Sequence, residues 1–176
     1  GTYRLRLAGD TSAITAPGQF VNLKLAGFFL RRPISVCDWT EGELTLIYKV
    51  LGRGTAAMTA FAPGAALSVL TGLGNGYDTS CSGERPLLVG GGVGAAPLFM
   101  LCERIAASEA SVDVVLGAQT KDALVCRERY AALLGGEPRC ATDDGTYGRA
   151  GFCTSLVEEA LAAAAAEGSP YDYVAV

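Results

Sequence analysis

The first seventy residues consist of short runs in which apolar and polar positions alternate. The runs cover residues 3–7, 20–25, 34–37, 44–48 and 66–70. Turn-forming pairs separate them, such as Pro17-Gly18 and Pro63-Gly64. Closely spaced strands of this kind predict a small antiparallel β-barrel. One helical pattern, at residues 55–61, interrupts the strands.

After residue 86 the pattern changes to strands that alternate with helices. An apolar run predicts a strand at residues 87–89, and further strands are expected at residues 112–116, 139–142 and 171–176. Helical periodicity separates them at residues 98–107, 124–134 and 155–166. This βαβαβαβ order predicts a parallel sheet with helices on its faces. The polar residues 79–85 are typical of a domain boundary, so we expect two domains, 1–82 and 83–176.

A glycine-rich stretch joins the first strand and helix of the second domain. The apolar run at residues 87–89 leads into Gly90, Gly91, Gly92 and Gly94, and a helical pattern follows. Backbone N–H groups at such a helix start favour a phosphate, and glycines let it approach closely. A proline, Pro97, stands where the G-x-G-x-x-G motif has its third glycine. The order of strand, glycines and helix favours a nucleotide phosphate site, and an ordinary tight turn is the alternative.

Two segments of the first domain are also candidate anion sites. The adjacent arginines Arg31 and Arg32 enter a strand, where a guanidinium fork suits a pyrophosphate and a solvated pair is the alternative. Further on, Gly52-x-Gly54-Thr55 opens a helix with Thr55 as its expected cap. The glycine-rich residues 72–78 form either a hairpin loop or part of a ligand rim.

Composition excludes several functional classes. A net charge of −4 without basic runs argues against nucleic acid as a partner, and no apolar run is long enough to span a bilayer. The chain has no histidine, which excludes Ser-His-Asp and Cys-His mechanisms, so we expect a bound cofactor to supply the chemistry of an enzyme. None of the six cysteines forms a C-x-x-C pair. We therefore read no zinc site or local iron–sulfur loop from them, and reduced thiols suit a cytoplasmic protein. Both ends of the sequence fall in expected strands, so we interpret the chain as part of a longer polypeptide.

Taken together, these motifs resemble the ferredoxin–NADP reductase superfamily. The closer resemblance is to the family of electron-transfer subunits of type B dihydroorotate dehydrogenases. It rests on segments spread over essentially the whole chain: Leu-Arg-Arg-Pro-Ile-Ser, Gly-Arg-Gly-Thr, Leu-Gly-Asn-Gly-Tyr-Asp, Leu-Val-Gly-Gly-Gly-Val-Gly, Leu-Gly-Ala-Gln and Asp-Gly-Thr-Tyr-Gly. The resemblance implies an N-terminal antiparallel β-barrel that binds flavin and a C-terminal α/β parallel-sheet domain that binds a nicotinamide nucleotide.

The resemblance also implies roles for individual residues. Arg32 would contact the FAD pyrophosphate and Ser35 the flavin ring, with Pro33 and Ile34 between them in the same segment. Ile34 stands where many relatives carry a ring-stacking tyrosine. The remaining cofactor residues would be Tyr48, Lys49 and Val50 beside the flavin, Gly54 and Thr55 at its phosphates, and Gly91, Gly92 and Gly94 at the NADH site. No side chain is assigned a catalytic role.

Two segments that follow expected strands bear on the nucleotide site. Residues 116–119, Leu-Gly-Ala-Gln, carry no arginine for a 2′-phosphate, although Lys121 is near, which favours NADH over NADPH. Residues 144–148, Asp-Gly-Thr-Tyr-Gly, are expected at the same crevice, with a plain turn as the alternative. The family's Cys-Gly-Pro segment and its cysteine cluster for a [2Fe-2S] centre do not occur in this sequence, so no cysteine is assigned to that cluster and no metal ligands are predicted.

The resemblance implies an FAD-dependent electron-transfer subunit that works between NAD(H) and an FMN-containing catalytic subunit in pyrimidine biosynthesis. The partners would assemble as a heterotetramer without nucleic acid or membrane. We expect the chain alone to bind FAD but not to complete the physiological electron transfer. One alternative is another diaphorase of the superfamily, of the NADH-dependent ferredoxin–NADP oxidoreductase or sulfide dehydrogenase type. A non-catalytic nucleotide-binding module is the other.

Overall fold

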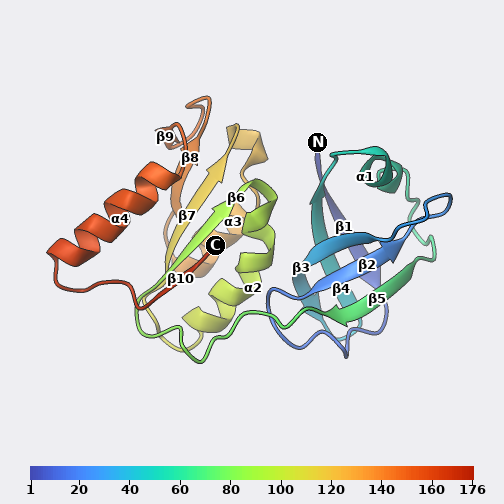
Figure 1. Ribbon diagram of the computed structural model, residues 1–176, viewed down its shortest axis with the longest axis horizontal. Coiled ribbons are helices and arrows are strands. Elements are labelled where there is room, and N and C mark those ends of the chain that lie inside the picture. The colour runs from blue at the N-terminus through green and yellow to red at the C-terminus, as the bar shows by residue number, and fades with distance from the viewer. The chain divides into compact units, whose positions relative to one another are not determined.

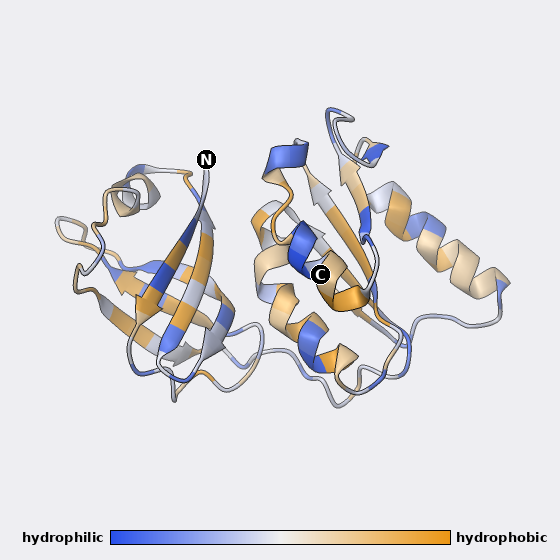
Figure 2. Cartoon of the chain, turned by 180° about the vertical axis from the view of Figure 1, so that it is seen from behind, coloured by the Kyte–Doolittle hydropathy of each residue, from blue (hydrophilic) through white to orange (hydrophobic).

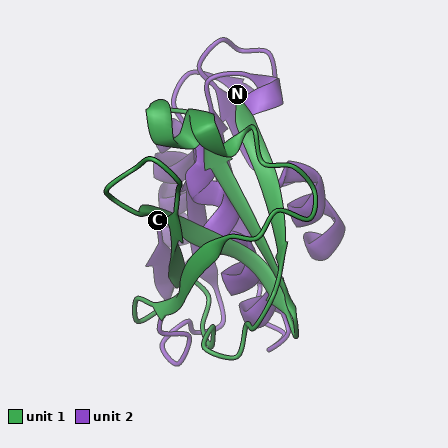
Figure 3. Cartoon of the chain, turned by 90° about the vertical axis from the view of Figure 1, so that its right-hand side faces the viewer, with its two compact units in different colours: residues 1–77 green, residues 78–176 purple.

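The computed structural model describes all residues, 1–176, and the chain forms two compact units. The first unit comprises residues 1–77 and the second residues 78–176 (Figure 3). The boundary expected after residue 82 falls inside the second unit, within the polar segment that precedes its first strand.

The first unit is a five-stranded antiparallel sheet with one short helix. Its elements are β1 (Thr2–Ala8), β2 (Phe20–Lys24), β3 (Arg32–Thr40), β4 (Glu43–Lys49), α1 (Arg53–Met58) and β5 (Ser68–Leu73). The strand order is β1-β4-β3-β2-β5, so β1 and β5 are the end strands of a sheet that curls around its core (Figure 1). The antiparallel architecture predicted for the first domain is confirmed.

Alternation along the strands builds the core of the first unit, and hydrophobic and hydrophilic colours follow it in Figure 2. On β4 the buried side chains are Leu44, Leu46 and Tyr48, while the residues between them are only partly buried. Helix α1 contributes Met58, which is 2% exposed. Burial of this side chain fixes the position of a helix that is too short to be stable by itself.

Strands β3 and β4 pair along only part of their length. The ladder runs from the turn pair Thr40–Glu43 to Val36–Leu46 and extends no further. Residues 32–35 of β3 pair with β2 instead, and residues 47–49 of β4 pair with β1. The two strands therefore diverge over the residues that the resemblance assigns to the flavin.

The second unit is a five-stranded parallel sheet with helices on both faces. Its strands are β6 (Pro86–Gly91), β7 (Asp113–Ala118), β8 (Arg139–Thr142), β9 (Arg149–Ala150) and β10 (Tyr173–Ala175), in the order β10-β6-β7-β8-β9. The helical segments are η1 (Gly92–Gly94), α2 (Ala95–Ala106), η2 (Lys121–Ala123), α3 (Arg127–Leu134) and α4 (Thr154–Ala166). Figure 1 shows α4 on the face of the sheet opposite to α2. The parallel α/β architecture predicted for this domain is confirmed.

Several helix and strand ends differ from the sequence-based prediction. Helix α2 begins at Ala95 rather than at residue 98, because Pro97 lies in the first turn, where a missing N–H costs no intrahelical hydrogen bond. The helix expected from residue 124 begins only at Arg127, since Cys126 adopts a left-handed conformation with φ 60°. The two-residue strand β9 was not predicted, because its pattern is too short to be recognised.

The two units differ in charge. The first carries seven Lys or Arg and four Asp or Glu side chains, a net charge of +3, and the second carries seven and fourteen, a net charge of −7. None of the helices combines the length and the apolar character that a membrane span requires.

Candidate functional site

The two anion-binding motifs of the first unit meet at Arg32 and Gly54. The Arg32 guanidinium lies 5.1 Å from the centroid of the Phe28 ring, and its Nη1 donates to the Leu30 carbonyl oxygen at 2.8 Å. A Cβ atom on residue 54 would overlap Nε of Arg32. Gly54 therefore provides the space in which the guanidinium lies, so the glycine motif and the arginine motif form one site.

A cavity of about 550 Å³ opens beside this pair. Its lining consists of Phe28, Arg32, Leu51, Gly52, Arg53, Gly54 and Thr55. Phe28 and Leu51 are apolar, whereas the arginines are cationic, and neither arginine forms a salt bridge. Cationic groups beside apolar side chains fit a ligand that joins phosphates to aromatic rings, as FAD does. Sequence reasoning did not assign Arg53, Phe28 or Leu51 to this site. Arg53 is the middle residue of Gly52-x-Gly54, a position that the motif leaves open.

Thr55 organises the turn at the start of α1. Its hydroxyl oxygen accepts hydrogen bonds from the N–H groups of Leu51 at 3.0 Å and Gly52 at 3.2 Å, and the hydroxyl donates to the Gly52 carbonyl at 3.1 Å. The N-cap is Gly52, so the expectation that Thr55 itself is the cap is wrong: Thr55 is the third helical residue and bonds back to the cap. First-turn N–H groups, including those of Gly54 and Thr55, have no acceptor within the helix.

The adjacent arginines have different roles. Arg31 donates through Nη1 to the carbonyl oxygens of Asn22 and Ser68, both at 3.2 Å, and thereby joins β2 to β5. Its side chain is thus occupied by backbone acceptors, and Arg32 alone of the pair lines the cavity. The alternative of a solvated pair is wrong for Arg31, because its partners are two strands of the sheet.

The rest of the β3 motif alternates between surface and core. Pro33 and Ser35 are exposed, whereas Ile34 packs against the buried cluster of the first unit. Ser35 is therefore accessible to a ligand, as the expected role requires. Ile34 uses its side chain for the core.

The segment 48–50 is tied to the core more closely than its expected role suggests. The Tyr48 ring is 4% exposed and stacks on Tyr3 with ring centroids 5.8 Å apart, and burial raises its pKa. Val50 packs on the same core, and its N–H donates to the Gly1 carbonyl oxygen at 3.0 Å. Lys49 is the exposed residue of the three.

The glycines that follow β6 serve two different purposes. A Cβ on Gly90 would lie 2.7 Å from Cα of Ala95, so this glycine allows helix α2 to pack closely on the strand. A Cβ on Gly91, Gly92 or Gly94 would meet no atom within 4 Å, although Gly92 also has a positive φ of 54°. The three glycines expected at the NADH site thus border open space at the carboxyl end of β6, where parallel sheets bind ligands.

The Asp-Gly-Thr-Tyr-Gly segment connects the loops that follow β7 and β8. The Thr146 hydroxyl oxygen accepts a hydrogen bond from the Lys121 N–H at 2.9 Å. Asp144 Oδ1 accepts from the N–H of Thr146 at 3.0 Å and from its hydroxyl at 2.7 Å, and these bonds lower the pKa of Asp144. The segment is a hydrogen-bonded turn, the alternative interpretation of this motif, and it lies beside the carboxyl ends of the strands.

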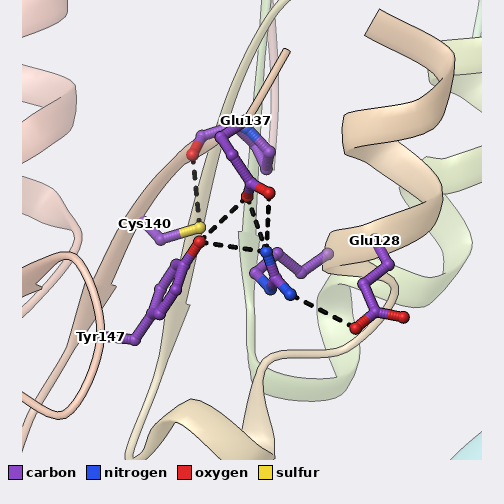
Figure 4. A network of polar contacts seen from close by, with 6 residues as sticks. Glu128, Glu137, Cys140 and Tyr147 are labelled. Atoms are coloured by element: carbon purple, nitrogen blue, oxygen red, sulfur yellow. Dashed lines mark hydrogen bonds and ion pairs between the residues drawn. The ribbon is translucent and has the colours of Figure 1, made fainter. Parts of the chain in front are cut away.

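A polar network continues from this turn (Figure 4). Arg127 Nη1 donates to Glu137 Oε2 at 2.8 Å and to the Tyr147 hydroxyl oxygen at 3.0 Å, and that hydroxyl donates to Glu137 at 3.1 Å. The hydrogen bond from Arg127 lowers the pKa of Glu137. Lys121 Nζ lies 5.7 Å from the centroid of the Tyr147 ring. Lys121 and Arg127 thus both have partners within the protein.

The cysteines are all free thiols. Cys153 lies against β7, where a Cβ on Gly117 would be 2.5 Å from its Sγ. Burial raises the pKa of Cys102 to about 12 and that of Cys140 to about 11, as expected for thiols that fill a core.

Comparison with curated proteins gives a consistent set of relatives, although no protein-family model matches the chain. The sequence is 42% identical over 165 residues to the electron transfer subunit of dihydroorotate dehydrogenase B (NAD(+)) from Bacillus caldolyticus, covering 89% of this chain and 63% of the relative. The corresponding subunit from Geobacillus thermodenitrificans is 43% identical over 166 residues, covering 90% of this chain and 64% of the relative. The chain therefore spans slightly less than two thirds of the length of these relatives.

Solved structures show the same fold. The NADH-dependent reduced ferredoxin-NADP oxidoreductase superposes with a TM-score of 0.74 at 27% identity, covering 89% of this chain and 60% of that one. The ferredoxin reductase of carbazole 1,9a-dioxygenase gives a TM-score of 0.75 at 21% identity, covering 98% and 55%, and is similar in fold. By sequence the chain is similar to the electron transfer subunits of dihydroorotate dehydrogenase B, and its two units have the ferredoxin–NADP reductase-like fold.

Proposed function

We propose that the chain is the flavin- and nucleotide-binding part of an electron-transfer subunit that passes electrons from NADH, through FAD, to a dihydroorotate dehydrogenase catalytic subunit. The observation that carries the proposal is the contact between Arg32 and Gly54, which builds a cationic cavity from the two motifs expected to hold FAD. The names of the relatives supply the partner, an enzyme that uses NAD(+).

The protein's own contribution is binding and orientation. Arg32 would bind the FAD pyrophosphate, the first turn of α1 would offer the N–H groups of Gly54 and Thr55, and the exposed Ser35 would face the ring. Bound FAD supplies the hydride and single-electron chemistry. No side chain is needed as an acid or base, in accordance with the absence of histidine.

The second unit would bind NADH at Gly91, Gly92 and Gly94. The engagement of Lys121 with Tyr147 and of Arg127 with Glu137 supports NADH over NADPH, because a 2′-phosphate would have to compete for these cations. The full-length protein would add a [2Fe-2S] centre and assemble with an FMN-containing catalytic subunit as a heterotetramer. The six free thiols fit a cytoplasmic location.

A ferredoxin-linked diaphorase is the second candidate function. It is favoured by the 27% identity to the NADH-dependent reduced ferredoxin-NADP oxidoreductase. The identity of the protein that accepts the electrons distinguishes the two candidates.

The first test is the visible spectrum of the purified chain and chromatography of the cofactor that heat releases. We expect FAD, and anaerobic addition of NADH should then bleach the flavin absorbance. Protein without flavin, even after incubation with FAD, would contradict the proposal. Reduction of a dihydroorotate dehydrogenase catalytic subunit by the full-length protein, but not of a ferredoxin, would select the first candidate.

A further inference from the structure

Arg53 is a second cationic side chain in the cavity of the first unit, and none of the motifs assigns it a role. It is exposed, lines the cavity together with Arg32, and makes no salt bridge or hydrogen bond within the protein. In the same unit, Arg6 forms a salt bridge with Glu43 at 2.7 Å, and Arg31 donates to backbone carbonyls. An arginine at the edge of a cavity without a protein partner can be used for a ligand.

The position of Arg53 is well defined although its side chain is exposed. It is the first residue of α1, and this helix is held by the buried Met58 at one end and by the hydrogen bonds of the Thr55 hydroxyl at the other. Its neighbours in sequence, Gly52 and Gly54, carry no side chains. The guanidinium can therefore extend over the cavity without competition from adjacent side chains.

Arg32 alone is a limited ligand for a pyrophosphate. Its Nη1 already donates to the carbonyl oxygens of Leu30 at 2.8 Å and Arg31 at 3.3 Å. A guanidinium has five N–H groups, so only some of them remain for a ligand with two charged phosphates. Charge-assisted hydrogen bonds from a second guanidinium would satisfy the rest of the pyrophosphate oxygens.

We propose that Arg53 is a second guanidinium ligand of the FAD pyrophosphate and acts together with Arg32. The proposal rests on the assignment of this cavity to FAD. Replacement of Arg53 should weaken the binding of FAD without disturbing the fold, because the Arg53 side chain has no partner in the protein.

The test is titration of flavin-free protein with FAD and with riboflavin, followed by flavin fluorescence. In R53Q we expect the Kd for FAD to rise about tenfold or more, the effect of losing hydrogen bonds to a charged group. R53K should recover part of the loss, because a lysine keeps the charge but not the fork. Riboflavin, which has no phosphate, should bind R53Q and the wild type equally.

R4Q is the matched control, because it removes an exposed arginine of the same unit that lies outside the cavity. Its Kd for FAD should equal that of the wild type, and the thermal unfolding of R53Q should be unchanged. Equal FAD binding by R53Q and the wild type would overturn the role of Arg53 and leave the FAD site intact. A wild-type protein that binds no FAD would instead overturn the proposed function and this inference with it.

Discussion

Arg32 and Gly54 are in contact across the first unit, and Nε of the arginine occupies the space that a Cβ of residue 54 would need. The arginine begins β3, and the glycine lies in the first turn of α1. Because the guanidinium is also held over the Phe28 ring, it cannot move aside without losing this contact. Residue 54 must therefore be a glycine because of the position of Arg32, and not because of the local turn.

Gly54→Ala should displace Arg32 and weaken FAD binding. We expect the Kd for FAD to rise at least tenfold, with little change in the free energy of unfolding, because the atoms that must shift belong to the end of the Arg32 side chain. Fluorescence titration and urea denaturation measure the two effects. Gly9→Ala is the control, because a Cβ there meets no atom within 4 Å and Gly9 does not line this cavity. Equal Kd values for FAD in the two variants would show that the contact between Arg32 and Gly54 does not contribute to FAD binding.

Gly90→Ala and Gly91→Ala should separate packing from ligand binding in the second unit. The first places a methyl group 2.7 Å from Cα of Ala95 and should lower the free energy of unfolding by about 1–3 kcal/mol. The second meets no atom within 4 Å, so stability should be unchanged while the Kd for NADH rises. Thermal unfolding and NADH fluorescence titration distinguish the two. If Gly91→Ala binds NADH like the wild type, the nucleotide does not approach this glycine.

The sequence was sufficient for the architecture because the longer strands and helices are recognisable from their own periodicity, whereas the two-residue β9 is not. The change from short, closely spaced strands to strands that alternate with helices predicted the antiparallel and parallel sheets. The predicted helix ends were wrong where the conformation of a single residue stops the helix, as at Cys126 with its φ of 60°.

Within the candidate site, the motifs located the backbone but not the direction of the side chains. Tyr48 belongs to the expected flavin segment, yet its ring is in the core, since alternation along β4 points it inward. The contact between Arg32 and Gly54 arises from tertiary packing and has no signal in the sequence. Arg53 was missed because the middle residue of a G-x-G motif has no fixed identity.

Thr146→Val should loosen the connection between the loops after β7 and β8. The variant removes the acceptor of the Lys121 N–H and the donor to Asp144, so we expect a loss of about 1 kcal/mol or more in the free energy of unfolding. Hydrogen exchange at the Lys121 amide should also become faster. Thr146→Ser keeps the hydroxyl and should behave like the wild type in both measurements. Equal exchange rates in the valine and serine variants would argue against this connection.

Tyr171 should make the stability depend on pH in alkaline solution. Burial, aided by the 2.7 Å hydrogen bond that its hydroxyl donates to Asp113, raises its pKa from 10.0 to about 12. The stabilisation is therefore complete below pH 10 and is lost as the pH rises towards 12, because the unfolded chain ionises first. The stability difference between the wild type and Tyr171→Phe should be constant below that window and shrink within it. A difference that stays constant up to pH 12 would show that the hydroxyl is not held in this way.

The opposite charges of the two units imply opposite responses to ionic strength. FAD and NADH are both anions, but one would bind to a unit of net charge +3 and the other to a unit of net charge −7. Counter-ions screen the attraction in the first case and the repulsion in the second. Added salt should therefore weaken the binding of the flavin while it favours the binding of the nucleotide, so a single salt concentration shifts the two occupancies in opposite directions.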